Sequence, residues 1–440
     1  MQQISLPFLP VPRGAELNKV DDADMPAHRW YRFVLSYPPH LVRDYLKCFA
    51  IRPGQRVLDP FSGTGTTVVE CKKLGIEGIG IEANPMAHFA SKVKIDWNPN
   101  PEVLERNSAD IGNRILARLA EQGIDDRTPT SPRDVERLIP ALRKLPGEMA
   151  DLLLTNSISP LPLHKTLMLL DEIMRSGQYR DHQMLALAKA LTGPIGNLHF
   201  GPEVGVGPAK TDAAVVTFWM NGIRGICRDL EALGNNQTQS VVHHADSRAI
   251  LPVIPEASID AVITSPPYPN EKDYTRTTRL ESVLLGFISS KDELRALKRS
   301  MVRSNTRGVY KGDDDDQWIS GHAEIERIAA AIEARRIELN KTSGFERLYA
   351  KVTKLYFGGM ARHLAEMRRI LRPGACLAYV VGDQASYLRI MIRTGQILAT
   401  IAKDLGYQVE GIDLFRTRLA TATKEQLREE VVVLRWPGLK

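Results

Sequence analysis

The chain has 440 residues, of which 43% are hydrophobic and 25% are charged, which is typical of a soluble globular protein. This length exceeds a usual single domain, so we expect one main domain with an inserted or added module. No apolar run is long enough to cross a bilayer, and the N-terminal stretch lacks the pattern of a signal peptide. The four scattered cysteines are expected to be reduced and to bind no metal, and the formal charge of +6 is compatible with a polyanionic partner.

Seven short apolar segments are predicted to be strands because they have strand length and are bounded by turn residues. They cover residues 56–59, 76–82, 240–245, 258–264, 375–382, 407–415 and 429–436. Most of them alternate with helical stretches, which predicts an α/β fold with a mostly parallel sheet and helices on both faces. The last two segments have no helix between them, so we expect a terminal antiparallel pair.

The first predicted strand runs into a turn with two glycines, Gly63 and Gly65, where the backbone can approach a ligand closely. The next strand ends in Glu82, placed to accept the two hydroxyls of a ribose. This pattern predicts half of a nucleoside-cofactor fold. A hydride-transfer fingerprint would need a third glycine where this chain has Val68, and Asp59 would repel a pyrophosphate. The turn therefore favours S-adenosylmethionine over NAD.

Residues 98–240 are expected to form a mostly helical insertion, with candidate helices at 102–122, 133–144, 165–176 and 182–191. A loop dense in glycine and proline, residues 193–208, interrupts these helices and contains His199, with Lys210 just beyond it. Such a loop can cover an active site or approach a nucleic acid. A plain connector between helices is an equally good interpretation.

The fourth predicted strand ends in Thr264-Ser265-Pro266-Pro267-Tyr268, which places a hydroxyl, rigid carbonyls and an aromatic ring at the rim of the sheet. This set can hold a flat base with an exocyclic amine, because the ring stacks on the base while the serine and carbonyl oxygens accept the amine's hydrogen bonds. Taken alone, the motif is only moderately specific, since paired prolines usually just stiffen a loop.

Basic residues accumulate after this motif, in an insertion near residues 288–350 and just before it. We expect contacts to nucleic-acid phosphates from Lys272, Arg276, Arg279, Arg303, Arg307 and Lys311, together with His199 and Lys210 of the helical insertion. Residues 303–311 are predicted to be a mobile loop, whereas 291–300 can equally be a solvated helix face. The acidic run 313–316 is expected to be a solvated turn rather than a metal site.

Together, the glycine turn and the Thr-Ser-Pro-Pro-Tyr motif resemble the amino-group DNA methyltransferases, which modify N4 of cytosine or N6 of adenine. The resemblance covers residues 28–97 and 241–440 and implies a Rossmann-like seven-stranded methyltransferase sheet. It implies a catalytic segment of Ser265, Pro266, Pro267 and Tyr268. It also implies S-adenosyl-L-methionine as cofactor, bound by Tyr37, Pro38, Asp59, Pro60, Phe61, Ser62, Gly63, Thr64, Gly65, Thr66, Glu82, Ala83, Asp246 and Ser247.

The resemblance divides the chain into residues 1–97, the insertion 98–240 and residues 241–440. Serine at the first catalytic position is more typical of cytosine-N4 enzymes, so cytosine N4 is the expected target. Adenine N6 is the alternative, and an RNA base-amine methyltransferase or a non-catalytic cofactor-binding protein are further ones. Double-stranded DNA is the expected partner, a cognate restriction endonuclease is a candidate one, and a cytoplasmic, nucleoid-associated location in a prokaryote is expected. The sequence does not indicate the oligomeric state.

Overall fold

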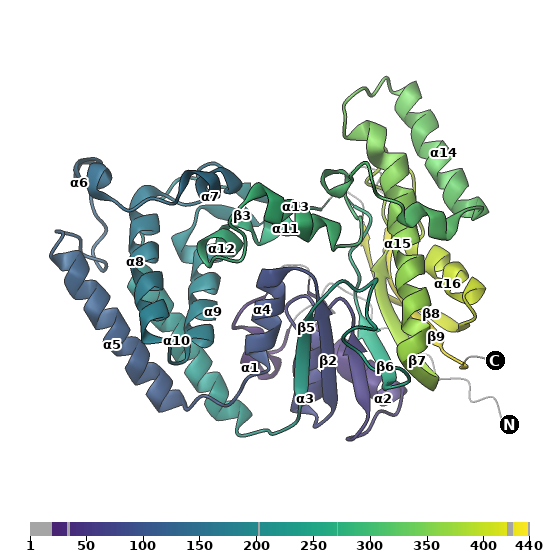
Figure 1. Ribbon diagram of the computed structural model, residues 1–440, viewed down its shortest axis with the longest axis horizontal. Coiled ribbons are helices and arrows are strands. Elements are labelled where there is room, and N and C mark those ends of the chain that lie inside the picture. Colours follow the sequence, from purple (N-terminus) through teal and green to yellow (C-terminus); the bar gives the residue numbers. More distant parts are fainter. Residues whose placement is uncertain (1–19, 33–35, 201–202, 271, 420–425, 439–440) are drawn as a thin grey trace.

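The computed structural model describes residues 20–32, 36–200, 203–270, 272–419 and 426–438. Its centre is a seven-stranded sheet with the order β5-β2-β1-β6-β7-β9-β8 (Figure 1). The strands are β1 (Arg56–Asp59), β2 (Glu77–Glu82), β5 (Ser240–His244), β6 (Ile259–Thr264), β7 (Leu371–Gly382), β8 (Gln408–Leu419) and β9 (Gln426–Arg435). The strands from β5 to β7 are parallel, while β9 pairs antiparallel with both β7 and β8. The predicted α/β fold and its terminal antiparallel pair are confirmed.

Successive residues of the central strands face opposite helical layers, as the two-residue period of a strand requires. The covering helices are α2 (Pro39–Cys48), α3 (Thr66–Lys73), α15 (Tyr349–Ile370) and α16 (Thr394–Asp404). Leu58 and Val262 pack in one core with α15 and α16. Their neighbours Val57 and Ala261 pack in another core with α2 and with Cys71 of α3. The sheet is therefore buried on both faces.

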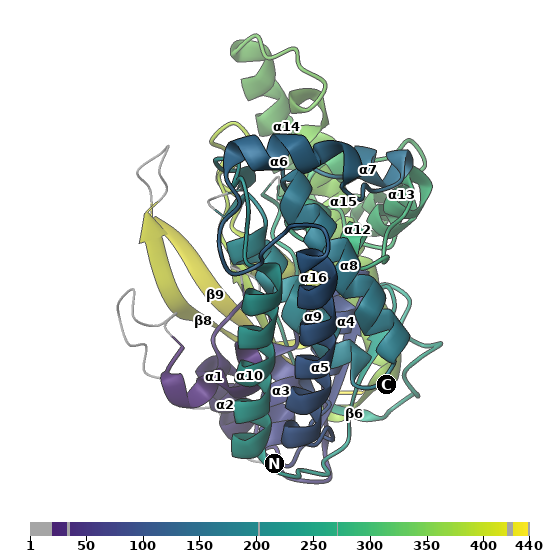
Figure 2. The same ribbon diagram turned by 90° about the vertical axis from the view of Figure 1, so that its left-hand side faces the viewer.

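The helical insertion leaves the sheet after α4 (Pro85–Lys94) and returns to it at β5. It contains α5 (Pro101–Ala120), α6 (Pro132–Leu138), α7 (Gly147–Leu152), α8 (Pro160–Ser176), α9 (Arg180–Ala190) and α10 (Val215–Leu233). Figure 2 shows the long helices α5 and α10 running side by side. The loop dense in glycine and proline contains a short hairpin, β3 (Leu198–Phe200) and β4 (Val204–Val206), that sequence patterning does not predict.

Asp229 of α10 fixes this insertion to the N-terminal part of the main domain. Its buried carboxylate accepts hydrogen bonds from the indole of Trp30 at 2.9 Å, from Nε of Arg29 at 2.9 Å and from the backbone of Ala27 at 3.3 Å. Ala27 belongs to α1 (Met25–His28). Because truncating a buried, fully bonded carboxylate leaves its donors unpaired, this contact resists separation of the two parts.

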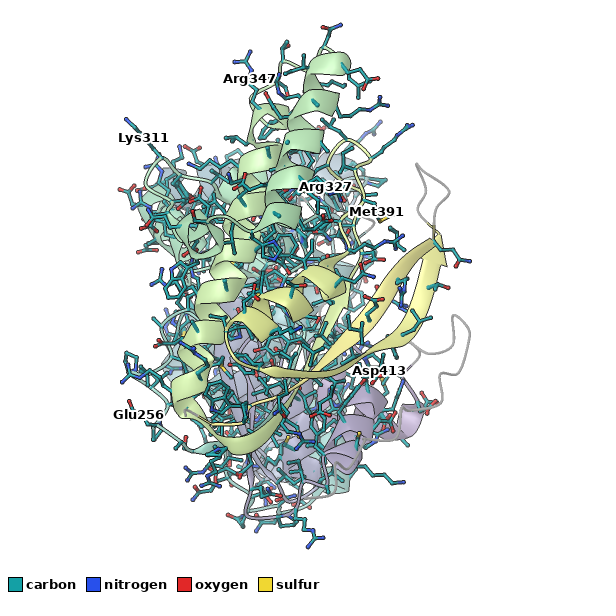
Figure 3. The ribbon with its side chains drawn as sticks, turned by 90° about the vertical axis from the view of Figure 1, so that its right-hand side faces the viewer. Glu256, Lys311, Arg327, Arg347, Met391 and Asp413 are labelled. Atoms are coloured by element: carbon teal, nitrogen blue, oxygen red, sulfur yellow. The ribbon has the colours of Figure 1, made fainter. Side chains whose placement is uncertain are left out.

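A second insertion lies between β6 and β7. It contains α11 (Tyr274–Thr277), α12 (Arg279–Leu284), α13 (Lys291–Arg299) and α14 (Ala323–Glu338). In Figure 3, α14 and the beginning of α15 project beyond the sheet, with Arg327 and Arg347 on that projection. The prediction of a solvated acidic turn is wrong for Asp315, which is buried between Arg248 and Arg362, whereas Asp314 is exposed. Within the described ranges, no helix has the length and apolarity needed to cross a membrane.

Candidate functional site

A cavity of about 600 Å³ lies where the parallel strands end. Its lining includes segments that directly follow five of them: Pro60 and Phe61 after β1, Glu82 and Ala83 at β2, Ala245 and Ser247 after β5, Ser265 to Tyr268 after β6, and Gln384 after β7. In open α/β sheets, ligands bind outside the carboxyl ends of the strands. The two sequence motifs therefore meet in one space.

Gly63 lines this cavity with backbone atoms alone, because it has no side chain. Its φ is +52°, a left-handed conformation that favours glycine, and the nearest atom to an added Cβ is the Phe61 carbonyl oxygen at 4.0 Å. The Gly63 amide donates to Oε2 of Glu82 at 2.7 Å, and the Ser62 amide donates to the Ile81 carbonyl at 2.9 Å. The turn after β1 is thus fixed to the end of β2, with its glycine facing the ligand space.

Gly65 has a different role from the one expected. An added Cβ would lie 2.5 Å from Oγ of Ser91 in α4, and φ at this position is +85°. Gly65 does not belong to the cavity lining. This glycine lets α3 and α4 approach each other, so it supports the cavity from behind.

Glu82 carries the carboxylate at the end of β2. Its Oε1 accepts a hydrogen bond from the Asn84 amide at 2.7 Å, and its Oε2 accepts the one from Gly63. Burial raises the pKa of Glu82 to about 7. Each carboxylate oxygen has a second lone pair, so this group can also accept the hydroxyls of a ribose.

Asp59 is fully buried and lies behind the cavity wall, whereas a direct cofactor contact was expected. Its Oδ1 accepts from the Thr264 hydroxyl at 2.6 Å and from the Phe61 amide at 3.1 Å. Its Oδ2 accepts from the Tyr37 hydroxyl at 2.8 Å. Burial raises the pKa of Asp59. Because protein donors satisfy this carboxylate, it organises the turn rather than contacting a ligand.

The Ser265 hydroxyl donates its hydrogen to the carbonyl of Val380 in β7 over 3.1 Å. A hydroxyl that has given its hydrogen to a carbonyl retains its lone pairs as acceptors. Ser265, Pro266 and Pro267 all line the cavity. This segment therefore presents acceptor oxygens to whatever enters.

The ring of Tyr268 lies against the backbone of β7. A Cβ added to Gly382 would stand 3.0 Å from Cε2 of Tyr268 and 3.4 Å from Cγ of Glu429. Burial raises the pKa of Tyr268, so the phenol stays protonated at neutral pH. Glycine at position 382 thus leaves the space that this ring occupies at the cavity wall.

Most expected cofactor residues do line the cavity: Tyr37, Pro60, Phe61, Ser62, Gly63, Thr64, Thr66, Glu82, Ala83 and Ser247. Pro38 does not, and it is instead the N-cap residue of α2. Asp246 does not line it either. Its carboxylate forms an ion pair with the guanidinium of Arg248, with 2.7 Å between Nη2 and Oδ2. The neighbours Ala245 and Ser247 occupy the lining there.

Several lining residues were missed because no motif marks them: Asn84, Glu203, Asn270, Tyr274, Met301, Val380, Gln384, Ser386, Phe415, Arg416 and Glu429. Glu203 is the exception. It lies in the loop dense in glycine and proline, for which covering an active site was one of the interpretations. Its carboxylate is 3.8 Å from the guanidinium of Arg307 in the second insertion.

The residues expected to contact phosphates fall into two groups. Lys272 lines the cavity, and His199, Arg307 and Lys311 are exposed. The side chain of Lys311 points outward at the edge of the molecule in Figure 3. A polyanion at the surface can therefore reach His199 and Lys311, and it can reach Arg307 in competition with Glu203.

The other group is engaged inside the protein, which argues against phosphate contacts. The side chain of Arg303 is only 5% exposed and makes two hydrogen bonds, of 2.9 and 2.8 Å, to Asp313. Arg279 donates to the hydroxyl of Thr275 at 2.9 Å. Lys210 donates to backbone carbonyls of residues 193, 194 and 196. Arg276 differs from these residues, because it is half-buried and its buried Nε has no hydrogen-bond partner among the described residues. A count of basic residues cannot distinguish side chains that bond within the protein from charges at the surface.

Comparison with known proteins adds independent findings. A family model described as DNA methylase matches residues 15–92. The Type II methyltransferase M.AvaI of a Nostoc species is 25% identical over 94% of this chain and 87% of its own length. The Type II methyltransferase M.BsoBI of Geobacillus stearothermophilus is 27% identical over 93% of this chain and 84% of its own. Among solved structures, TrmN from Thermus thermophilus aligns at 11% identity and a TM-score of 0.25, covering 90% of this chain and 48% of that chain.

The matched family region contains the glycine turn after β1 and the carboxylate at the end of β2, both of which line the cavity. The longer matches extend through both halves of the sheet. S-adenosyl-L-methionine is the methyl donor that this similarity implies. These matches support a place for the chain among the amino-group methyltransferases.

Proposed function

We propose that this protein is a site-specific DNA methyltransferase that transfers a methyl group from S-adenosylmethionine to N4 of a cytosine flipped out of the duplex. The observation that carries the proposal is that Gly63, Glu82 and the segment from Ser265 to Tyr268 line one cavity. Its volume, about 600 Å³, is within the range of small-molecule sites. Relatives that span nearly all of the chain are Type II methyltransferases.

The residues at the cofactor side of the cavity fit S-adenosylmethionine. Glu82 offers acceptors for the ribose hydroxyls, Phe61 and Ile81 offer apolar surface for an adenine, and the hydroxyls of Ser36 and Tyr37 lie near the turn. Open space beside Gly63 allows a ligand to approach the backbone. When bound, the cofactor supplies an electrophilic methyl group on its sulfonium.

The chain's own residues would orient and activate the amine. The Ser265 oxygen and the Pro266 carbonyl accept hydrogen bonds from the two N–H groups, which draws the nitrogen away from conjugation with its ring. The bond from Ser265 to Val380 supports this role, because it directs the hydroxyl hydrogen away from the amine. Tyr268 would stack on the extruded base. The surplus proton leaves the methylated nitrogen once it is acidic, so no dedicated general base is needed.

Adenine N6 is the second candidate, since the same acceptors suit its amine. Serine at the first catalytic position favours cytosine. Residues 98–240, including the hairpin that reaches the cavity with Glu203, are our candidate for reading or covering the target sequence. A cognate endonuclease is proposed from the relatives' Type II names alone.

The test is to sequence the methylome of a methylation-free host that expresses the chain, beside a host expressing Ser265→Ala. Nucleoside mass spectrometry of the same DNA identifies the modified base. We expect N4-methylcytosine at one short motif in the first host and little in the second. N6-methyladenine would transfer the proposal to the second candidate, and unmodified DNA in both hosts would refute DNA methylation.

A further inference from the structure

Gln384 has an unsatisfied donor at the cavity. The residue follows β7, lines the cavity and is only 3% exposed. Its side-chain nitrogen Nε2 is buried and has no hydrogen-bond partner among the described residues. A buried amide N–H without a partner is costly, so native proteins rarely retain one without a reason.

The backbone around Gln384 is held firmly. Its amide donates to the Ile392 carbonyl at 3.1 Å, and its carbonyl accepts from the Ile392 amide at 2.7 Å. The preceding residue, Asp383, is paired with Arg393. Because the backbone is fixed on both sides, the side-chain amide is the part that can turn toward a ligand.

The position of Gln384 is tied to the catalytic segment. Val380, Gly382 and Gln384 are alternate residues at the end of β7 and beyond it. The Val380 carbonyl accepts the hydrogen bond from Ser265, and the Tyr268 ring lies beside Gly382. Gln384 lines the same cavity. The unsatisfied donor therefore belongs to the base side of the site rather than to the turn that faces the ribose.

We propose that Gln384 reads the target base by donating a hydrogen bond from its side-chain amide to the ring nitrogen next to the methylated amine. This inference rests on the proposed function. Cytosine has an acceptor at N3 beside its amine, and adenine has one at N1. Thymine and guanine have N–H donors at the corresponding ring positions. Acceptors on Ser265 and Pro266 next to a donor on Gln384 thus match the two amino bases and oppose the other two.

The buried Nε2 of Gln384 reaches the base by rotation about χ3, the last torsion of the side chain. This rotation breaks no hydrogen bond of Nε2, because the group has none within the described structure. The new bond would satisfy the donor only when an amino base is in place. A site built to bond a base in this way rejects an analogue that lacks the partner atom.

The experiment combines Gln384→Ala with a change in the DNA. Single-turnover methyl transfer is measured on the target duplex found by methylome sequencing and on the same duplex with 3-deazacytosine, or 1-deazaadenine if the target is adenine. We expect wild type to lose about tenfold to a hundredfold on the deaza duplex, and Gln384→Ala to lose about as much on natural DNA. The variant should lose less than about threefold more on the deaza duplex, because the shared bond is already gone.

Two further variants sharpen the result. Gln384→Glu should be slower than Gln384→Ala, because a carboxylate oxygen would face the ring nitrogen. Gln396→Ala, the same substitution at an exposed position of α16, should match wild type within about twofold. Circular dichroism melting of each variant shows whether it is folded.

Three outcomes would overturn the inference: independent losses from the variant and the deaza base, a Gln384→Glu rate equal to wild type, or weakened S-adenosylmethionine binding by Gln384→Ala. The last would show that the amide serves the cofactor. Failure of the proposed function is distinguishable, because wild type would then methylate no DNA at all.

Discussion

The hydroxyl of Thr264 donates a hydrogen bond to Oδ1 of Asp59 over 2.6 Å, with both residues fully buried. Asp59 ends β1 and precedes the cofactor turn, while Thr264 ends β6 and precedes Ser265. The two strands pair in parallel, with Leu58 opposite Val262. One buried bond therefore sets the catalytic segment at a fixed place relative to the turn.

Thr264→Val should show what this bond contributes. The substitution keeps the shape of the side chain but leaves a buried carboxylate oxygen with one donor fewer, so we expect a loss of about 1–3 kcal/mol in the free energy of unfolding. The rate of methyl transfer should fall as well, because Ser265 follows directly. Urea denaturation measures the first effect. Thr400→Val, at an exposed site on α16, should change stability by less than about 0.5 kcal/mol.

Gly65→Ala should act through folding rather than through direct contact with the cofactor. The new Cβ would meet Oγ of Ser91 at 2.5 Å in a left-handed conformation, so stability should drop by about 1–3 kcal/mol. Adding Ser91→Ala removes the clashing oxygen and should restore part of that loss. A double-mutant cycle measured by denaturation tests this, and purely additive effects would contradict the clash.

Ser265→Ala should retain cofactor binding and most DNA affinity but lose turnover. A lost transition-state hydrogen bond costs about 2–4 kcal/mol, or roughly a hundredfold to a thousandfold in rate. Tyr268→Ala should weaken capture of the flipped base, whereas Tyr268→Phe keeps the stacking ring and should be mild. Single-turnover assays of all three on one duplex compare them. A Ser265→Ala rate within threefold of wild type would mean that this segment is only a loop.

The pKa of Glu82, raised by burial to about 7, predicts a pH dependence. In the ligand-free protein the folded state binds this proton more tightly than the unfolded chain does, so stability should decline as pH rises from about 4.5 to about 7. Ribose hydroxyls donate to the ionised carboxylate, so cofactor affinity should instead rise with pH, by several-fold between pH 6 and pH 8. Calorimetry should find this rise diminished in Glu82→Gln.

Arg307 and Arg303 offer a matched pair for the DNA surface. Neutralising exposed Arg307 should flatten the plot of log affinity against log salt by roughly one unit, as loss of one phosphate contact requires. Arg303→Ala should instead destabilise the fold by about 3–5 kcal/mol, because it leaves Asp313 without its buried partner. An unchanged slope for Arg307→Ala would place that residue outside the DNA interface.

The sheet could be predicted from sequence because local signals coincide there. Central strands such as β1 and β6 contain short apolar runs, and residues such as Gly63 and Asn84 mark turns and helix starts that need little tertiary context. The motif segments also line the cavity as expected. These motifs can be recognised from residue types at fixed spacing, which the sequence alone contains.

The remaining details depend on contacts between distant residues. Gly65 has the same local signature as Gly63, yet only its neighbour Ser91, on another helix, reveals its role. Arg303 reads as a surface charge until Asp313 is placed beside it. Gln384 carries no motif at all, because its place in the site is set by the pairing of β6 with β7. Such roles follow from three-dimensional neighbours.

The lengths of α5 and α10 set the distance between the hairpin and the point where the insertion leaves the sheet. The insertion leaves the sheet at one end and returns there, yet its hairpin places Glu203 in the cavity at the other end (Figure 1). The 20 residues of α5 span about 30 Å, since each helical residue rises 1.5 Å. Removing one turn from both helices would withdraw the hairpin by about 5 Å and rotate it. A change in the length of the other loops of the insertion would leave the position of the hairpin unchanged. Those loops can therefore vary in sequence without altering the cavity.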